Sequence, residues 1–449
     1  MQENARQCAV EALMRLHGKQ GFSNKVVDSF LKKHALSSED KTFFTKLVYG
    51  VEERKLTIDY FLNKASKMPL RKMHPCVVEA LRIGVYQILF MDKVPVSAAV
   101  NESVKIVRAG KQERATGITN ALLRAIARQW EAVEEPKTIE KLLPNGEKDV
   151  LFSCPSGVMH IFEESYGKEV TQKILDTINE QPPTFIRFNS LKTNADAFET
   201  ILRKKDISFE TVDFLEQAYC ISPGSEKALR NLPEDMWYYQ DLASQLCVKA
   251  LDVEPGQLVM DVCAAPGGKS IGFAQQMNNQ GRIVCTDLYP QKCDEMQERA
   301  KRMGITILET LPRDATQTCP KQWENQFDRV LCDVPCSGLG VILRRPEIRY
   351  HDLEKAKQLP TVQYAILEES SKMVKPGGFL QYSTCTLNKK ENEEIVERFL
   401  EVHTEFVPRV LDLKEFFYAY SLTPHWQVTL FPHLYNTDGF FIAGFEKRK

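Results

Sequence analysis

Two cysteines come directly after predicted strands, at positions where a parallel sheet can hold reacting groups. Cys336 follows a buried run that ends at Asp333, and Cys385 follows a second run that ends at Thr384. The carboxyl ends of neighbouring parallel strands form one edge of a sheet, which is where such folds bind ligands. A cysteine thiolate there can add to C6 of a cytosine, so that C5 becomes nucleophilic enough to accept a methyl group. Asp333 is the natural candidate to hydrogen-bond N3 of the ring and to assist this addition.

A glycine turn upstream of the cysteines has the form of a nucleotide-binding loop. It follows a predicted strand over 258–263, the pair Gly267-Gly268 lets the backbone approach a ligand, and a helix is expected to begin at Lys269 with free N–H groups. The next predicted strand ends in Asp287, an acid suited to ribose hydroxyls. Asp314 follows the third strand and can bind an adenine amino group. Together these features predict a site for S-adenosylmethionine.

A phosphate-binding loop is the alternative for the same turn. Residues 263–270 match the pattern GxxxxGK[ST] except that Cys263 replaces the first glycine, and 330–333 imitates a strand that ends in a magnesium-binding aspartate. The missing glycine and Pro266, which has no N–H group, both weaken a phosphate nest. An ATPase also has no need of Asp287. Binding of S-adenosylmethionine or of ATP would separate the two interpretations.

The elements that must position these residues change in character along the chain. We expect a helical domain over 1–130, a polar linker over 131–150 and a small α/β domain over 151–235. Over 236–449, strands and helices alternate, which predicts a parallel sheet with right-handed crossovers and a last strand that can pair antiparallel. Strands are expected over 258–263, 282–287, 305–309, 327–333, 378–384 and 438–445, and helices over 240–251, 269–277, 291–303, 354–373 and 389–402.

Composition limits the class of protein. The 449 residues are 43% hydrophobic, enough for two to three domains. The longest apolar run, over 77–91, is interrupted by Glu79 and Arg82 and is too short for a bilayer. The 12 cysteines lack the spacing of a zinc site. We therefore expect a cytoplasmic protein with reduced thiols, without a metal or a membrane partner.

Charge is distributed unevenly. Residues 1–132 contain 22 lysines and arginines against 13 acidic residues, whereas the remainder contains 37 against 47. A basic first domain on an acidic second half is typical of a module that binds a polyanion such as RNA.

Six stretches resemble those of one enzyme family: Tyr239–Gln245, Asp261–Lys269, Thr286–Leu288, Asp333–Gly338, Tyr382–Thr386 with Glu391-Asn392, and Asp438–Phe441. Over essentially its full length, the chain resembles the bacterial 16S rRNA cytosine-5 methyltransferases of the Sun (Fmu) type, the ribosomal RNA small subunit methyltransferases B. The resemblance implies a multidomain protein with an all-α, NusB-like RNA-binding domain, a small α/β RNA-recognition domain and a Rossmann-like catalytic domain.

The resemblance also assigns roles. Spacing alone favours Cys336 as the nucleophile, but the family implies that Cys385 attacks and that Cys336 assists release of the product. The residues that it places around the S-adenosylmethionine are Cys263, Ala264, Ala265, Pro266, Gly267, Gly268, Lys269, Asp287, Asp314 and Asp333.

RNA contacts are implied for four residues: Arg187, Asn189, Arg344 and Arg345. Leu343 stands where the family usually has an arginine, so one basic contact is lost or moved. The expected partner is 16S ribosomal RNA, and we expect no obligate protein partner. The alternatives are the same chemistry on tRNA or another rRNA site, and an RNA-binding assembly factor without catalysis.

Overall fold

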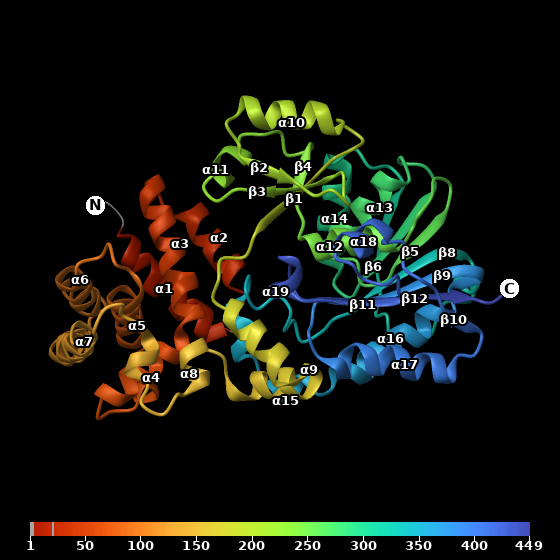
Figure 1. Cartoon of the computed structure of the whole chain (residues 1–449). Helices are drawn as coiled ribbons and strands as arrows, with labels where there is room; N and C mark the ends of the chain where they lie inside the picture. Colours follow the sequence, from red (N-terminus) through yellow and green to blue (C-terminus); the bar gives the residue numbers. More distant parts are fainter. Residues whose placement is uncertain (1–3, 20–21) are drawn as a thin grey trace. The chain divides into compact units, whose positions relative to one another are not determined.

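The chain divides into two compact units, which are described separately. The computed structural model describes residues 4–19 and 22–449 (Figure 1). By their contacts, Met1–Asn179 and Ile342–His351 form the first unit, and Glu180–Val341 and Asp352–Lys449 form the second. This division does not coincide with the boundary predicted after residue 150, and the predicted domain limits stay a prediction.

The described residues of the first unit are helical, as predicted for 1–130. Its elements are α1 (Ala5–Lys19), α2 (Ser23–Lys33), α3 (Ser38–Glu53), α4 (Lys55–Ala65), η1 (Leu70–Lys72), α5 (Pro75–Phe90), α6 (Val96–Ala109), η2 (Glu113–Ala115), α7 (Thr116–Glu131), η3 (Ile139–Leu142), α8 (Lys148–Phe152), α9 (Ser156–Thr177) and η5 (Pro346–Tyr350). The segment expected to be a linker over 131–150 therefore contains the 3-10 turn η3 and the start of α8.

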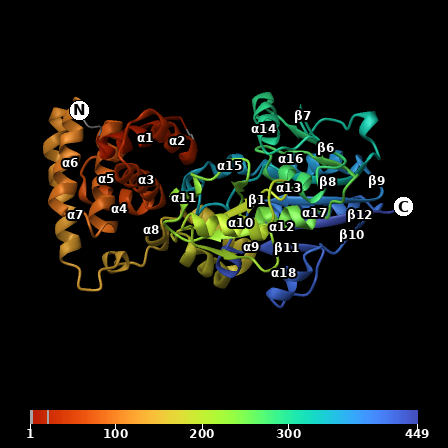
Figure 2. The same cartoon turned by 90° about the horizontal axis from the view of Figure 1, so that it is seen from above.

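Helix α5 forms the centre of this unit. It is buried on almost every side and contacts α1, α3, α4, α6 and α7. Pro75 occupies its first turn, where no N–H is needed, and the His74 side chain accepts a hydrogen bond from the Cys76 N–H at 3.2 Å. At Gly50 of α3, an added Cβ would lie 2.0 Å from the Tyr86 ring, so glycine lets α3 approach α5 closely. Helices α6 and α7 lie side by side (Figure 2).

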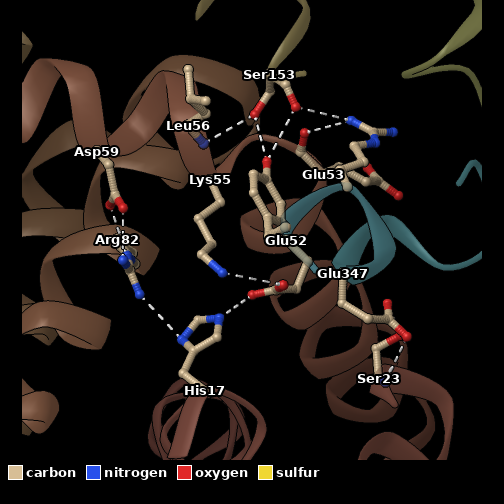
Figure 3. Close-up of polar contacts among 12 residues, drawn as sticks. His17, Ser23, Glu52, Glu53, Lys55, Leu56, Asp59, Arg82, Ser153 and Glu347 are labelled. Atoms are coloured by element: carbon tan, nitrogen blue, oxygen red, sulfur yellow. Dashed lines mark hydrogen bonds and ion pairs between the residues drawn. The ribbon is translucent and has the colours of Figure 1, made fainter. Parts of the chain in front are cut away.

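A cluster of charged side chains joins the helices inside the first unit (Figure 3). His17 lies between Glu79, whose carboxylate is 2.8 Å from Nδ1, and Glu52, which pairs with Nε2. Arg82 forms two hydrogen bonds with Asp59, at 2.7 and 2.8 Å. Burial lowers the pKa of His17, but the two glutamates more than offset this effect and the pKa is raised. Opposite charges thus link α1, α3, α4 and α5.

The segment 342–351 packs among the helices of the first unit although it lies far downstream in the chain. Figure 3 shows its teal ribbon, with Glu347 labelled, among the brown helices. The Glu347 carboxylate accepts hydrogen bonds from the N–H and the hydroxyl of Ser23, at 3.1 and 2.8 Å. Arg349 is 1% exposed and donates to the Glu53 carbonyl at 3.1 Å and to Asn179 Oδ1 at 3.0 Å. The segment is therefore part of the core of this unit.

The second unit begins with a small antiparallel sheet. Its strands lie in the order β2-β3-β1-β4, with α10 and α11 beside them in the chain. The elements are β1 (Thr184–Phe188), α10 (Ala195–Lys204), β2 (Phe209–Thr211), β3 (Ala218–Ile221), α11 (Glu226–Leu229) and β4 (Trp237–Tyr239). The small α/β domain is confirmed in outline, but β3 and β4 were not predicted, because runs of three or four residues carry little periodicity.

The larger sheet has the Rossmann-like topology that was predicted. The elements are α12 (Leu242–Ala250), β5 (Leu258–Asp261), α13 (Gly268–Gln276), β6 (Arg282–Asp287), α14 (Pro290–Arg302), β7 (Leu308–Pro312), η4 (Lys321–Trp323), β8 (Phe327–Asp333), α15 (Leu353–Ala356), α16 (Leu359–Ser371), β9 (Val374–Thr384), η6 (Lys389–Glu391), α17 (Glu393–Val402), β10 (Phe406–Pro408), α18 (Lys414–Ala419), β11 (Gln427–Leu430), α19 (Pro432–Tyr435) and β12 (Phe440–Lys447). The order is β10-β12-β9-β8-β5-β6-β7, with β11 paired to β12.

Strands β5 to β9 of this sheet are parallel, and β12 pairs antiparallel to β9, as expected for the last strand. Helices α12, α13 and α14 cover one face and α16 and α17 the other (Figure 1). The strand order reverses between β5 and β8, so the topological switch point lies at their carboxyl ends.

Two predicted helices of the second unit are interrupted. The helix expected over 354–373 is split into α15 and α16, because Pro360 lies in a first turn. The helix expected over 389–402 is split into η6 and α17 at Asn392, whose φ and ψ of −120° and −99° are not helical. None of the helices in residues 4–19 and 22–449 is long and apolar enough to cross a membrane.

Candidate active site

The two cysteines lie together at the carboxyl ends of neighbouring strands. Their Sγ atoms are 3.3 Å apart, Cys336 in the loop after β8 and Cys385 in the loop after β9. The parallel register of β8 and β9, which pairs Asp333 with Ser383, aligns the two strand ends. Hydrogen bonding to Cys385, together with burial, raises the pKa of Cys336 well above its ordinary value. At neutral pH, Cys336 is thus held as a thiol beside Cys385.

Asp333 connects this pair to the glycine turn. Its Oδ2 is 2.5 Å from the Lys269 ammonium, and its Oδ1 accepts a hydrogen bond from the Ser383 hydroxyl at 2.9 Å. Burial lowers the pKa of Lys269, but the charge of Asp333 more than offsets this effect, so that the pKa is raised. The ammonium also lies 5.4 Å from the centre of the Phe440 ring. Lys269 is therefore a fixed positive charge at the switch point.

The glycine turn is shaped as its sequence predicts. Gly267 has a φ of +88°, a conformation that favours glycine, and an added Cβ would lie 3.1 Å from Met296. Helix α13 begins at Gly268, one residue before the expected start. Below the turn, buried Asp261 accepts a hydrogen bond from the Ser270 hydroxyl at 2.6 Å. Burial raises the pKa of Asp261 to about 7.

The other predicted cofactor residues lie at the same edge of the sheet. Asp287 ends β6 and accepts a hydrogen bond from the Tyr289 N–H at 3.1 Å, and Lys292 lies 3.7 Å from it. Asp314 follows β7 and accepts hydrogen bonds from the Thr316 hydroxyl and N–H, at 2.7 and 3.0 Å. These bonds, the hydroxyl first, lower the pKa of Asp314. The acid at the end of β6, the acid after β7 and the first N–H groups of the nine-residue helix α13 fit a ligand with a ribose and a carboxylate.

Cys263 was expected to line the cofactor site. It lies in the turn after β5 and is partly buried. Burial raises its pKa well above the ordinary value, so the side chain is an unreactive thiol.

Arg187 and Asn189 are buried in the structure, and their predicted contact with RNA stays a prediction. Arg187 is 1% exposed and donates to Gln275 Oε1 at 2.9 Å. Asn189 is fully buried and donates to the carbonyls of Asp235 and Met303, at 2.8 and 2.9 Å. Arg187 thus ties the small sheet to helix α13, and Asn189 ties it to the end of α14. The polar groups of both side chains are used for hydrogen bonds inside the second unit.

Arg344 and Arg345 belong to the segment 342–351 of the first unit. Arg345 is exposed, and its guanidinium lies 5.3 Å from the centre of the Phe22 ring. Arg344 is partly buried. An RNA contact through these arginines stays a prediction.

Several residues that support the site were not predicted. Asp241 caps α12 and also accepts a hydrogen bond from the Thr437 hydroxyl at 2.5 Å. Gly340 donates to the Cys385 carbonyl at 3.0 Å, and a Cβ there would lie 1.9 Å from the Gly439 carbonyl oxygen. Asp241 and Gly439 lie in stretches shared with a family, but nothing in the sequence marked Thr437 or Gly340, because each contact joins segments far apart in the chain. In the described part of the chain, no group of three or more His, Cys, Asp or Glu side chains is arranged to hold a metal.

Comparisons with known families agree with this arrangement. The model of the 16S rRNA methyltransferase RsmB/F family matches residues 248–446, that of the NusB family matches 3–128, and that of the RsmF/B-like ferredoxin-like domain matches 155–224. The last range includes α9, which the contacts group with the first unit.

Individual relatives match nearly the whole chain. The chain is 32% identical to a probable ribosomal RNA small subunit methyltransferase B of Bacillus subtilis, over 99% of both chains. It is 33% identical to a protein of the same description from Synechocystis, again over 99% of both. The crystal structure of PH0851 superposes with a TM-score of 0.82 at 26% identity, over 99% of this chain and 98% of that one.

The family model matches the part of the chain that carries the cysteines and the glycine turn, and it is a methyltransferase model, so the ATPase alternative is set aside. The cofactor of this family is S-adenosylmethionine. Because relatives more than 30% identical match nearly the full length, the chain belongs to the family of the ribosomal RNA small subunit methyltransferases B.

Proposed function

We propose that this chain transfers a methyl group from S-adenosylmethionine to C5 of a cytosine in 16S ribosomal RNA, through a covalent cysteine adduct. The observation that carries the proposal is the pair of Sγ atoms 3.3 Å apart, at the strand ends that also hold Asp333. A methyltransferase that acts on an exocyclic amine has no need of a thiol there. A carbon that is not nucleophilic by itself does need one.

In the proposed reaction, Cys385 acts as the nucleophile. Its thiolate forms a bond to C6, and the electron pair that moves to C5 forms the new carbon–carbon bond to the methyl group. S-Adenosylmethionine supplies that methyl group as an electrophilic sulfonium. A water molecule then accepts the C5 proton, and the bond between the Cys385 sulfur and C6 breaks, which restores the aromatic ring and the Cys385 thiolate. The Cys336 thiol, 3.3 Å from the Cys385 sulfur, assists this last step by hydrogen-bonding the departing sulfur.

Asp333 and Lys269 have supporting roles in this proposal. Asp333 is hydrogen-bonded to Ser383 and paired with Lys269, contacts that fix its carboxyl group and support its proposed role at the pyrimidine edge. An ordinary thiol with a pKa of about 8.5 is only about 3% thiolate at neutral pH. In this proposal, the positive charge of the sulfonium favours the ionised form of Cys385.

The RNA substrate is proposed from the relatives and from the basic first unit. The relatives are described as methyltransferases of the ribosomal RNA small subunit, and the first unit matches the NusB family. The excess of lysine and arginine in residues 1–132 suits binding to a phosphate backbone. The target base has to be unstacked to reach the cysteines. A cytoplasmic location, where ribosomal RNA is assembled in bacteria, is part of this proposal.

The test uses 16S RNA that contains 5-fluorocytosine. The fluorine blocks elimination, so the full-length protein should accumulate a covalent complex with this RNA, visible on a denaturing gel. Cys385→Ala should abolish the complex. Cys336→Ala should form it even on unmodified RNA, because attack persists while release stalls.

The outcomes separate the alternatives. A complex that survives Cys385→Ala but not Cys336→Ala would reverse the two roles. Wild-type protein that binds 16S RNA but forms no complex would favour the assembly factor without catalysis. A complex with fluorinated tRNA and none with 16S RNA would move the same chemistry to another substrate.

A further inference from the structure

The loops that carry the two cysteines are both held by one pair of residues, Glu391 and Asn392. Glu391 ends the 3-10 turn η6, and Asn392 is the N-cap residue of α17. Both are fully buried. We refer to these two residues as the Glu391–Asn392 clamp. The mechanism above gives them no role.

Glu391 holds the Cys336 loop through Ser337. Its carboxylate accepts hydrogen bonds from the Ser337 N–H at 2.9 Å and from the Ser337 hydroxyl at 2.6 Å. Gln363 and Asn388 each donate a further hydrogen bond to it at 2.9 Å. Four donors meet the two carboxylate oxygens, an arrangement that suits an ionised acid and that an amide cannot reproduce.

Asn392 holds the Cys385 loop through the residues on either side of that cysteine. Its Oδ1 accepts a hydrogen bond from the Thr384 hydroxyl at 2.5 Å, and its Nδ2 donates to the Thr386 carbonyl at 2.9 Å. The Thr386 and Ser337 hydroxyls are 2.7 Å apart, and since Ser337 donates to Glu391, Thr386 is the donor to Ser337. A continuous hydrogen-bond chain therefore crosses from one cysteine loop to the other.

We propose that the Glu391–Asn392 clamp fixes the distance between the two thiols and holds Cys336 in place beside Cys385, the cysteine that attacks. This inference rests on the proposed function, and it makes Glu391 a positioning residue that acts through Ser337. The charge of Glu391 is also one of the causes that raise the pKa of Cys336, after hydrogen bonding to Cys385, burial and the charge of Cys385. The same carboxylate thus holds the Cys336 loop in place and adds to the effects that raise the pKa of Cys336.

The test replaces Glu391 by glutamine in the full-length protein. In Glu391→Gln, two of the four donors face an amide N–H₂ and the negative charge is lost. A shift of a reacting group by about 1 Å costs on the order of 100-fold in rate. We expect kcat for methyl transfer to fall roughly 10- to 100-fold, while KM for S-adenosylmethionine stays within about twofold. The variant should also accumulate the covalent complex on unmodified RNA, because release depends on Cys336.

A second readout does not depend on the RNA. Iodoacetamide alkylation of each cysteine, followed by mass spectrometry across pH, reports when each thiol ionises. In Glu391→Gln, Cys336 should be alkylated at lower pH than in the wild type. If the wild-type protein forms no complex with fluorinated RNA, the proposed function fails, while the alkylation profile still tests the clamp.

Two further variants keep the inference falsifiable. Glu394→Gln, which replaces an exposed acid in the first turn of α17, is the matched control and should behave as the wild type in both assays. Ser337→Ala keeps the carboxylate but removes the hydroxyl bridge, so it should stall release even if Glu391→Gln does not fold. Wild-type kinetics and wild-type alkylation in Glu391→Gln, or in Ser337→Ala where only that variant folds, would overturn the proposal.

Discussion

Both sheets of the second unit have buried or half-buried polar side chains in or next to their strands. In the small sheet these side chains bond to other parts of the protein, whereas in the large sheet they lie where a ligand can reach them. Arg187 in β1 donates a hydrogen bond to Gln275, and Asn189, just after β1, donates to two backbone carbonyls of the same unit. At the ends of β8 and β9, Asp333 and the two cysteines lie at the switch point, where a ligand can reach them. A polar residue in a strand is therefore informative about function only together with its place in the sheet.

Lys269→Met should have the largest effect on the residues at the ends of β8 and β9, measured as the rate of methyl transfer. It leaves Asp333 without its ammonium partner beside the reacting cysteines, so methyl transfer should fall on the order of 100-fold or more. The measurement is kcat with labelled S-adenosylmethionine. Lys292→Met, which removes an ammonium 3.7 Å from Asp287, is the control and should cost only a few-fold. Equal losses in the two variants would contradict a special role for the Lys269–Asp333 pair.

Arg187→Ala tests the other side of the comparison. It empties a large buried volume and leaves Gln275 without its donor, so the free energy of unfolding should fall by roughly 3 kcal/mol. RNA affinity of the folded variant should not change. Urea unfolding and an RNA titration, with the exposed Lys204→Ala as control, measure both quantities. A tenfold weaker RNA affinity with unchanged stability would support the prediction that Arg187 contacts RNA.

Asp261→Asn should have a smaller effect, visible as a change in pH dependence. Burial raises the pKa of Asp261 from 3.8 to about 7, so the folded protein holds a proton there that the unfolded chain has lost. This contribution to stability is full below about pH 4 and is lost as pH rises towards 7. Between pH 5 and pH 8, the wild type should lose about 2 kcal/mol more than Asp261→Asn. Asp294→Asn, an exposed acid, should lose as much as the wild type over the same interval.

Much of the catalytic fold was predictable because its signals are local. The buried runs that form β5, β6, β8 and β9 are long enough to be recognised. Each run ends in a polar residue, an aspartate in β5, β6 and β8 and a threonine in β9. The glycine turn was predicted from Gly267-Gly268 after a buried strand, and the last strand from the alternation of strands and helices over 236–449. The topology then brings Cys336 and Cys385 together without any further information.

The remainder depends on contacts between distant residues. The burial of Arg187 depends on Gln275, which lies 88 residues further along the chain. The role of Glu391 depends on Ser337, 54 residues earlier. Strand β4 has only three residues and is defined by its pairing with β1. No pattern in a single stretch of sequence carries such information.

The packing of residues 342–351 in the first unit has a consequence for how this protein can be divided. A fragment that began at Glu180 would keep the ten residues but lose the partners of Glu347 and Arg349. The buried Arg349 guanidinium, 13 residues after Cys336 in the chain, would then lose its hydrogen-bond partners Glu53 and Asn179. The catalytic part is thus not an independent cassette. Residues 342–351 lie between two segments of the second unit in the sequence but fold with the first unit. Truncated genes, exchanged domains and expressed fragments therefore have to include both units.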